Sequence, residues 1–156
     1  MKNYSLYFIF AFLISCGEKP KELVNVGASF QQSEELKENP LLMHPITSSI
    51  QPKDSTMSTL YGNDIAFMYA QKNSGSDYPE NAVLYEVTWQ QKPDELWFGA
   101  HVPKEIKSVE KITFNDNHSS EYEMFEGKPL KIKSLDADWK NRRKDTVLSQ
   151  RKAVSP

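Results

Sequence analysis

The sequence predicts an α+β domain built on a mainly antiparallel β-sheet of four to five strands with flanking helices. Three observations predict it. Short alternating runs of apolar and polar residues are separated by turns, helical patterns lie on either side of them, and the aromatic residues gather in one stretch. Of the thirteen aromatic residues after position 16, eleven lie between Tyr61 and Phe125. We therefore expect one domain over residues 40–156, with its core at about 55–135.

The clearest strand pattern covers residues 82–90. Its alternation predicts two faces, one with Val83, Tyr85, Val87 and Trp89 and the other with Leu84, Glu86 and Thr88. Further strands are expected at about 58–61, 109–114 and 121–125, joined by short turns that favour antiparallel pairing. No internal repeat is visible.

Two helices are expected beside these strands. The first covers residues 64–71, with Asn63 as its N-cap, and the second covers residues 136–151, which are charged except for Trp139, Val147 and Leu148. Residues 40–52 contain Pro40, Pro45 and Pro52, so we expect an irregular arm there.

The first fifteen residues have the pattern of an export signal. A basic start precedes eleven mostly apolar residues, which is too short to cross a bilayer and suits the apolar region of a secretory signal. The sequence Leu13-Ile14-Ser15-Cys16 resembles the lipobox of bacterial lipoproteins. This resemblance implies cleavage before Cys16 and attachment of diacylglycerol and palmitate to it. The alternatives are an ordinary cleaved signal that happens to contain a cysteine, or a buried N-terminal helix.

Lipidation at Cys16 would make the membrane a partner of the chain, because two or three acyl chains give stable attachment. Gly17 follows the cysteine in place of aspartate, which favours the outer membrane, facing the periplasm or the cell surface of a Gram-negative bacterium. Residues 16–39 mix charges with scattered apolar residues and show no sustained period, so we expect a flexible tether.

Composition excludes several classes of protein. One cysteine among 156 residues rules out an intramolecular disulfide framework and a four-cysteine iron–sulfur site. The net charge of −2 and the pI of about 5.9 give no electrostatic reason to expect a nucleic-acid partner.

Three phrases follow one another in the sequence: TLYGNDIA from Thr59, YPENAVLYEVTW from Tyr78, and WFGAHVPKEIKSVEKI from Trp97. In this order and spacing they resemble the cytochrome P-460 family, which includes cytochrome c′-β. The resemblance covers about residues 55–125. It implies a mainly antiparallel β fold, a homodimer and export. Haem-bearing relatives bind nitric oxide or oxidise hydroxylamine through a c-type haem attached near the C-terminus.

The chain departs from this family where the haem is attached. No cysteine follows Cys16, so the C-x-x-C-H attachment motif is absent, and the corresponding segment reads LDADWK from Leu135. Where some relatives cross-link a lysine to the haem, this chain is expected to have Glu86. The resemblance therefore implies the fold without covalent haem, and no cofactor is predicted.

Five residues form a candidate pocket: Glu86, Trp89, Trp97, Phe98 and His101. An inward-facing Glu86 could accept a proton, but the favoured interpretation places it outward on a half-exposed face with Thr88. His101 could bind non-covalent haem from an apolar pocket, and the simpler alternative is a surface histidine. The three aromatic residues more often supply core and dimer contacts than a ligand cage.

Two functions follow for the domain. The first is a non-catalytic, lipid-anchored module that binds a small molecule or a partner, and the chain is more consistent with this class than with an enzyme. The second is a non-covalent haem protein related to the nitric oxide-binding or hydroxylamine-oxidising members of the family. No catalytic residue or metal site is predicted from the sequence.

Overall fold

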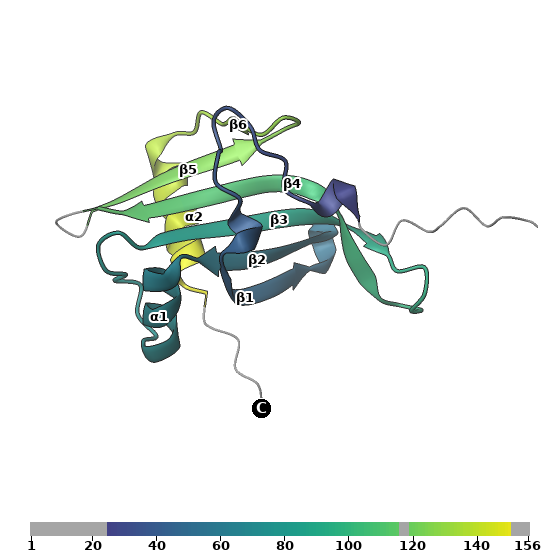
Figure 1. Cartoon of the computed structure of the whole chain (residues 1–156), viewed down its shortest axis with the longest axis horizontal. Helices are drawn as coiled ribbons and strands as arrows, with labels where there is room; N and C mark the ends of the chain where they lie inside the picture. The colour runs from purple at the N-terminus through teal and green to yellow at the C-terminus, as the bar shows by residue number, and fades with distance from the viewer. Residues whose placement is uncertain (1–24, 116–118, 151–156) are drawn as a thin grey trace, which may run out of the picture.

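The fold is a six-stranded antiparallel sheet in a computed structural model that describes residues 25–115 and 119–150. Each strand pairs with its neighbour in the sequence, so the strand order across the sheet equals the chain order (Figure 1). The strands are β1 (His44–Gln51), β2 (Thr56–Gly62), β3 (Val83–Pro93), β4 (His101–Phe114), β5 (Ser120–Glu126) and β6 (Lys131–Ile132). The predicted α+β class and the antiparallel sheet are confirmed, with six strands in place of four to five.

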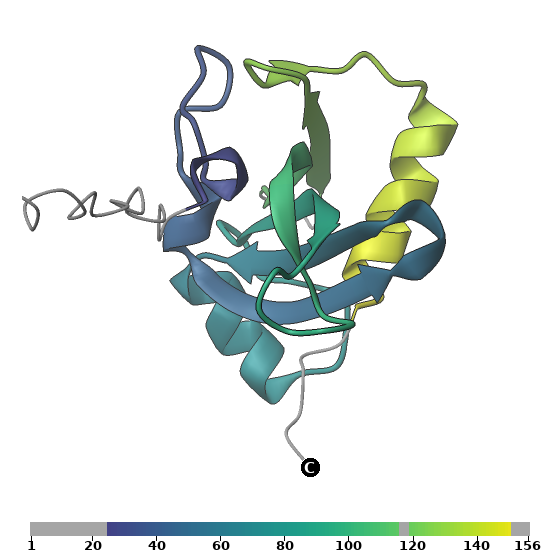
Figure 2. The same cartoon turned by 90° about the vertical axis from the view of Figure 1, so that its right-hand side faces the viewer.

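Two α-helices and three short 3-10 turns complete the fold. The helices are α1 (Asp64–Lys72), between β2 and β3, and α2 (Ala137–Leu148), after β6; the turns are η1 (Val26–Ala28), η2 (Pro40–Leu42) and η3 (Pro52–Asp54). Both helices contribute buried residues to a cluster on one face of the sheet, and residues 25–43, here called the strap, cover the other face (Figure 2).

Strand β3 shows how the sequence produces these two layers. Leu84 belongs to the cluster under the helices, whereas Tyr85, Val87 and Trp89 belong to the cluster under the strap. This is the alternation expected for a strand, whose successive side chains point to opposite faces. The predicted faces of residues 83–89 are therefore confirmed, but both of them are covered by other parts of the chain.

The strap corrects the expectation of a flexible tether for the part of it that the structure describes. Leu36 is 3% exposed and packs in the cluster with Tyr85, Val87 and Trp89. The Trp89 indole donates a hydrogen bond to the Ala28 carbonyl oxygen at 2.9 Å. The scattered apolar residues of this segment lack a period because they pack as irregular chain rather than as a helix or strand. Residues 16–24, and the signal at residues 1–15, lie outside the described residues.

The junction between β2 and α1 explains the phrase Gly-Asn-Asp-Ile-Ala in structural terms. The Asn63 side chain accepts hydrogen bonds from the amides of Ala66 and Val83, so it caps the helix and ties it to β3. A Cβ at Gly62 would stand 2.9 Å from side-chain carbon atoms of Ala66 and Ile46, so only glycine fits without movement. The prediction of α1 with Asn63 as its N-cap is confirmed.

One segment of the expected irregular arm is a strand. Residues 44–51 form β1 at the edge of the sheet, paired with β2 through a register shift between Pro45 and Thr47. Proline lacks a backbone N–H and is tolerated in edge strands, which do not need every donor. Of the prolines that indicated an irregular arm, Pro45 and Pro52 therefore mark the ends of an edge strand, and Pro40 begins η2.

Candidate functional site

The structure does not bring the five predicted pocket residues together. Glu86 and Trp89 are three residues apart in β3, so their side chains lie on opposite faces of the sheet. Glu86 is buried on the helix side, and Trp89 is 6% exposed on the strap side. A common pocket is excluded by the strand geometry itself.

The other three residues lie at the end of the β3–β4 hairpin. Trp97 is 71% exposed and Phe98 is fully exposed at the tip, and His101 is an exposed residue paired with Pro93. Of the core and dimer contacts expected for Trp97 and Phe98, the core contacts are not formed, because β3 and β4 extend further than the sequence pattern indicated. Their length carries the tip away from both buried clusters.

The favoured outward position of Glu86 is also wrong. Its side chain is 3% exposed, and Arg143 Nη2 on α2 donates to its Oε2 at 2.8 Å. The prediction assumed that only the face with Tyr85 and Val87 was packed. Helix α2 covers the opposite face as well. A carboxylate in the middle of β3, such as Glu86, is therefore buried on either face of the sheet.

Arg143 connects two buried carboxylates. Glu86 and Glu110 are directly opposite each other in β3 and β4, and each side chain is 3% exposed. Arg143 Nε donates to Glu110 Oε2, and Arg143 Nη2 donates to Glu110 Oε1, both at 2.8 Å. Tyr122 on β5 donates its hydroxyl to Glu110 Oε2 at 2.6 Å. These four residues are called the ion cluster below.

The ion cluster shifts the pKa of its two donors. Burial lowers the pKa of Arg143, but the hydrogen bonds to Glu110 and the negative charges of Glu110 and Glu86 outweigh it, so the net shift is upward. Burial, the hydrogen bond to Glu110 and its charge together raise the pKa of Tyr122. Arg143 therefore stays protonated and Tyr122 stays neutral, and both act as fixed donors.

This arrangement fits a structural role. Like charges directly opposite each other in a sheet repel, and a bidentate arginine offsets that repulsion through two charge-assisted hydrogen bonds. Each of the four side chains is engaged by another member of the cluster. The cluster can hold α2 on the sheet, and its groups are committed to one another rather than to a substrate.

Arg143 lies in the helix expected at residues 136–151, among charged residues to which the sequence assigned no role. The spacing of Trp139, Arg143 and Val147 at four-residue intervals would have predicted its true position, because residues i, i+4 and i+8 share one face of a helix. The inward direction of Trp139 and Val147 therefore applies to Arg143 as well.

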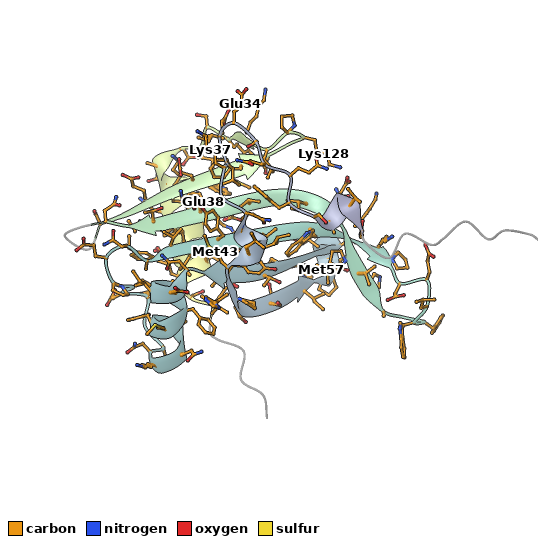
Figure 3. The ribbon with its side chains drawn as sticks, in the orientation of Figure 1. Glu34, Lys37, Glu38, Met43, Met57 and Lys128 are labelled. Atoms are coloured by element: carbon orange, nitrogen blue, oxygen red, sulfur yellow. The ribbon has the colours of Figure 1, made fainter. Side chains whose placement is uncertain are left out.

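A second polar contact holds the strap to the opposite face. The Tyr85 hydroxyl donates to Glu38 Oε2 at 2.6 Å, and burial together with this hydrogen bond raises the pKa of Tyr85. Figure 3 labels Glu38 on the strap, above the sheet, with Met43 and Met57 nearby over β1 and β2. Both methionines pack against the strap-side cluster.

Two hollows flank the turn between β5 and β6. The first has a volume of about 90 Å³ and is lined by the strap and the turn, including Gly27, Gln31 and Leu130. The second is an open groove of about 670 Å³ between strap residues 32–37 and residues 129–131, with Glu34, Glu35, Lys37 and Lys131 along it. Figure 3 labels Glu34 and Lys37 on one side of this region and Lys128 on the turn. The first hollow is smaller than a typical ligand pocket of about 300–1,000 Å³.

Within residues 25–115 and 119–150, three or more His, Cys, Asp or Glu side chains do not gather in a group able to hold a metal ion. Neither helix of that part of the chain has the length and apolar character needed to cross a membrane. Compared with known proteins, the chain matches no family model and no curated sequence.

Proposed function

We propose that this chain is an exported lipoprotein whose domain is a non-catalytic interaction module. The observation that carries the second part is the packing of the sheet. The face formed by Tyr85, Val87 and Trp89 is filled by strap residues such as Leu36, and the face with Leu84 is filled by the helices. Both faces of the sheet are thus packed by other parts of the described chain, which supports recognition on the surface.

The residues present do not fit the haem of cytochrome P-460 relatives. A c-type haem needs cysteines that the chain lacks after Cys16. The histidine considered for a non-covalent haem, His101, stands exposed on a hairpin arm, away from the buried clusters. The haem-protein alternative has no supporting contact among the described residues.

A relationship to the cytochrome P-460 family is part of the proposal. The antiparallel sheet with a helix between β2 and β3 supports it, as does the structural task of Gly62 and Asn63 in the phrase that carries the resemblance. At the position where some relatives are expected to have a lysine, this chain has Glu86. Glu86 belongs to the ion cluster, which holds α2 on the sheet. In this proposal the fold persists while the haem chemistry is lost, and the homodimer implied by the family is retained.

We assign small-ligand binding in this proposal to the open groove beside the strap. It joins acidic residues Glu34 and Glu35 with the basic residues Lys37 and Lys131, so a zwitterionic or mixed-charge group would find both partners there. Its open form favours weak, exchangeable binding over a tightly enclosed ligand.

Two measurements test the proposal. Wild-type cells grown with labelled palmitate should incorporate it into the protein, and Cys16→Ser should abolish both labelling and recovery in the outer-membrane fraction. Purified protein incubated with haem should show no Soret band beyond that of free haem. A bound Soret band that disappears in His101→Ala would contradict the non-catalytic assignment and favour the haem alternative, whereas a mature chain beginning downstream of Cys16 would contradict the lipid anchor.

A further inference from the structure

The tip of the β3–β4 hairpin exposes three large apolar side chains in succession. Leu96 is 76% exposed, Trp97 is 71% exposed and Phe98 is fully exposed. Exposed apolar residues are common singly on protein surfaces, but a consecutive group at a projecting tip usually marks a contact with another apolar phase. The occupant that covers these three side chains is inferred from where the N-terminal part of the chain meets the hairpin.

Part of the backbone at the tip is hydrogen-bonded within the loop. The Asp94 amide donates to the Ala100 carbonyl at 2.9 Å, and the Ala100 amide donates to the Trp97 carbonyl at 3.0 Å. The Asp94 carboxylate accepts from the Leu96 amide at 2.7 Å. Backbone groups satisfied within the loop do not need water, and this is the condition for placing a loop near hydrocarbon.

The strap begins beside the base of this hairpin. Asn25 is the first described residue, and its Nδ2 donates to the Pro103 carbonyl oxygen on β4 at 2.6 Å. The position of a Cβ at Gly27 would be 2.9 Å from the Lys104 carbonyl oxygen, so η1 lies directly against the same strand. Figure 1 shows η1, in purple, next to the point where the hairpin leaves the sheet.

Chain length fixes how far this point can be from a lipidated Cys16. Nine residue steps separate Cys16 from Asn25, and they span at most about 30 Å when fully extended. Phe98 precedes Pro103 by five residues, which span at most about 17 Å. An anchor at Cys16 therefore keeps the tip within about 50 Å of the lipidated residue.

We propose that Leu96, Trp97 and Phe98 insert into the interfacial region of the phospholipid bilayer that holds the Cys16 anchor. Tryptophan and phenylalanine suit this region, where amphipathic and aromatic rings sit at headgroup level. The hairpin carries charges of both signs beside the tip, including Lys92, Asp94 and Glu95, so apolar contact rather than attraction to anionic lipid drives the insertion.

This inference rests on the proposed lipid anchor, and it adds an orientation. The two attachments, at the acyl chains and at the tip, fix the end of the sheet that carries η1 and the hairpin toward the membrane.

Tryptophan fluorescence in vesicles tests the contact. The lipidated full-length protein is reconstituted into phosphatidylethanolamine–phosphatidylglycerol vesicles with and without brominated acyl chains. Brominated lipid should quench part of the emission, and Trp97→Phe should remove the quenched part, whereas the matched control Trp139→Phe should retain it. Leu96→Ser with Phe98→Ser should abolish the quenching while leaving Trp97 as reporter, and Leu42→Ser, which changes an 84% exposed residue elsewhere, should not.

The outcomes separate the inference from the anchor on which it rests. If the protein incorporates palmitate but brominated lipid does not quench Trp97, the inference is overturned and the lipid anchor stands. A Trp97 signal shielded from aqueous acrylamide but insensitive to brominated lipid assigns the tip to a protein contact, such as a second copy of the chain, and also overturns it. Absence of palmitate at Cys16 overturns both proposals.

Discussion

The ion cluster makes a sharp prediction about the substitution Arg143→Met. This change keeps most of the side-chain volume and the helix propensity, but it leaves Glu86 and Glu110 opposite each other with their side chains 3% exposed. Removing one partner of a buried pair costs about 3–5 kcal/mol. Because the Arg143 side chain is itself 28% exposed, water already screens part of the interaction, and we expect a loss of about 2–4 kcal/mol of unfolding free energy.

Urea denaturation followed by circular dichroism measures this loss. The slope of unfolding free energy against urea should stay unchanged, since the folded surface is the same, while the midpoint falls. The matched control is Arg142→Met on the same turn of α2, an exposed position where the change should stay within about 0.5 kcal/mol.

A second background separates charge repulsion from lost packing. In the presence of Glu86→Gln, only one buried carboxylate remains opposite the methionine, so Arg143→Met should cost at least about 1 kcal/mol less than it does in the wild type. An equal cost in both backgrounds, or a cost below about 1 kcal/mol in the wild type, would refute the claim that Arg143 neutralises this pair.

Three further predictions concern the strap, the tyrosines and the helix cap. Leu36→Ala should destabilise the protein by about 2–5 kcal/mol in urea, because it leaves a cavity under the strap; a surface-like cost below about 0.5 kcal/mol would show that the strap is detachable. Tyr85 and Tyr122 have a raised pKa in the folded protein, whereas a tyrosine in the unfolded chain ionises near 10.0. Their contribution to the unfolding free energy is therefore fully present below about pH 10 and decreases as the pH rises further, because only the unfolded chain releases the two protons. Denaturation at increasing pH should show that fall, and Tyr85→Phe with Tyr122→Phe should flatten it; an unchanged slope would contradict the assignment. Asn63→Ala should cost about 1–2 kcal/mol, measured by thermal unfolding against Asn73→Ala at the other end of α1, and equal costs would argue against the cap.

The sequence pattern predicted the elements whose periodicity is local. Alternation in residues 83–89 gave both faces of β3, and Asn63 with its following apolar spacing gave the start of α1. Strand β1 was missed because Pro45 and Pro52 are read locally as breakers, whereas their tolerance depends on β1 being an edge strand. Whether a strand lies at the edge depends on the arrangement of the whole sheet, so it cannot be read from a short segment of the sequence.

The candidate site was predicted less well for a related reason. The five expected residues were grouped by proximity in the sequence. Strand β3 places Glu86 and Trp89 on opposite faces of the sheet, and a long hairpin carries Trp97, Phe98 and His101 away from both. The partners that matter, Arg143 for Glu86 and Glu38 for Tyr85, lie 57 and 47 residues away along the chain. Only the helix spacing around Arg143 carried a local signal of its burial.

The strap has a consequence for the order in which the protein folds. Each strand of the sheet pairs with its sequence neighbour, so most strand contacts close short loops and form quickly. The strap is made earlier than any strand, yet its contact from Ala28 to Trp89 spans 61 residues and requires β3 to be in place. The first segment of the domain to leave the ribosome is thus among the last to dock. Hydrogen exchange should find it among the first to open, uncovering Tyr85 and Val87 before the sheet itself comes apart.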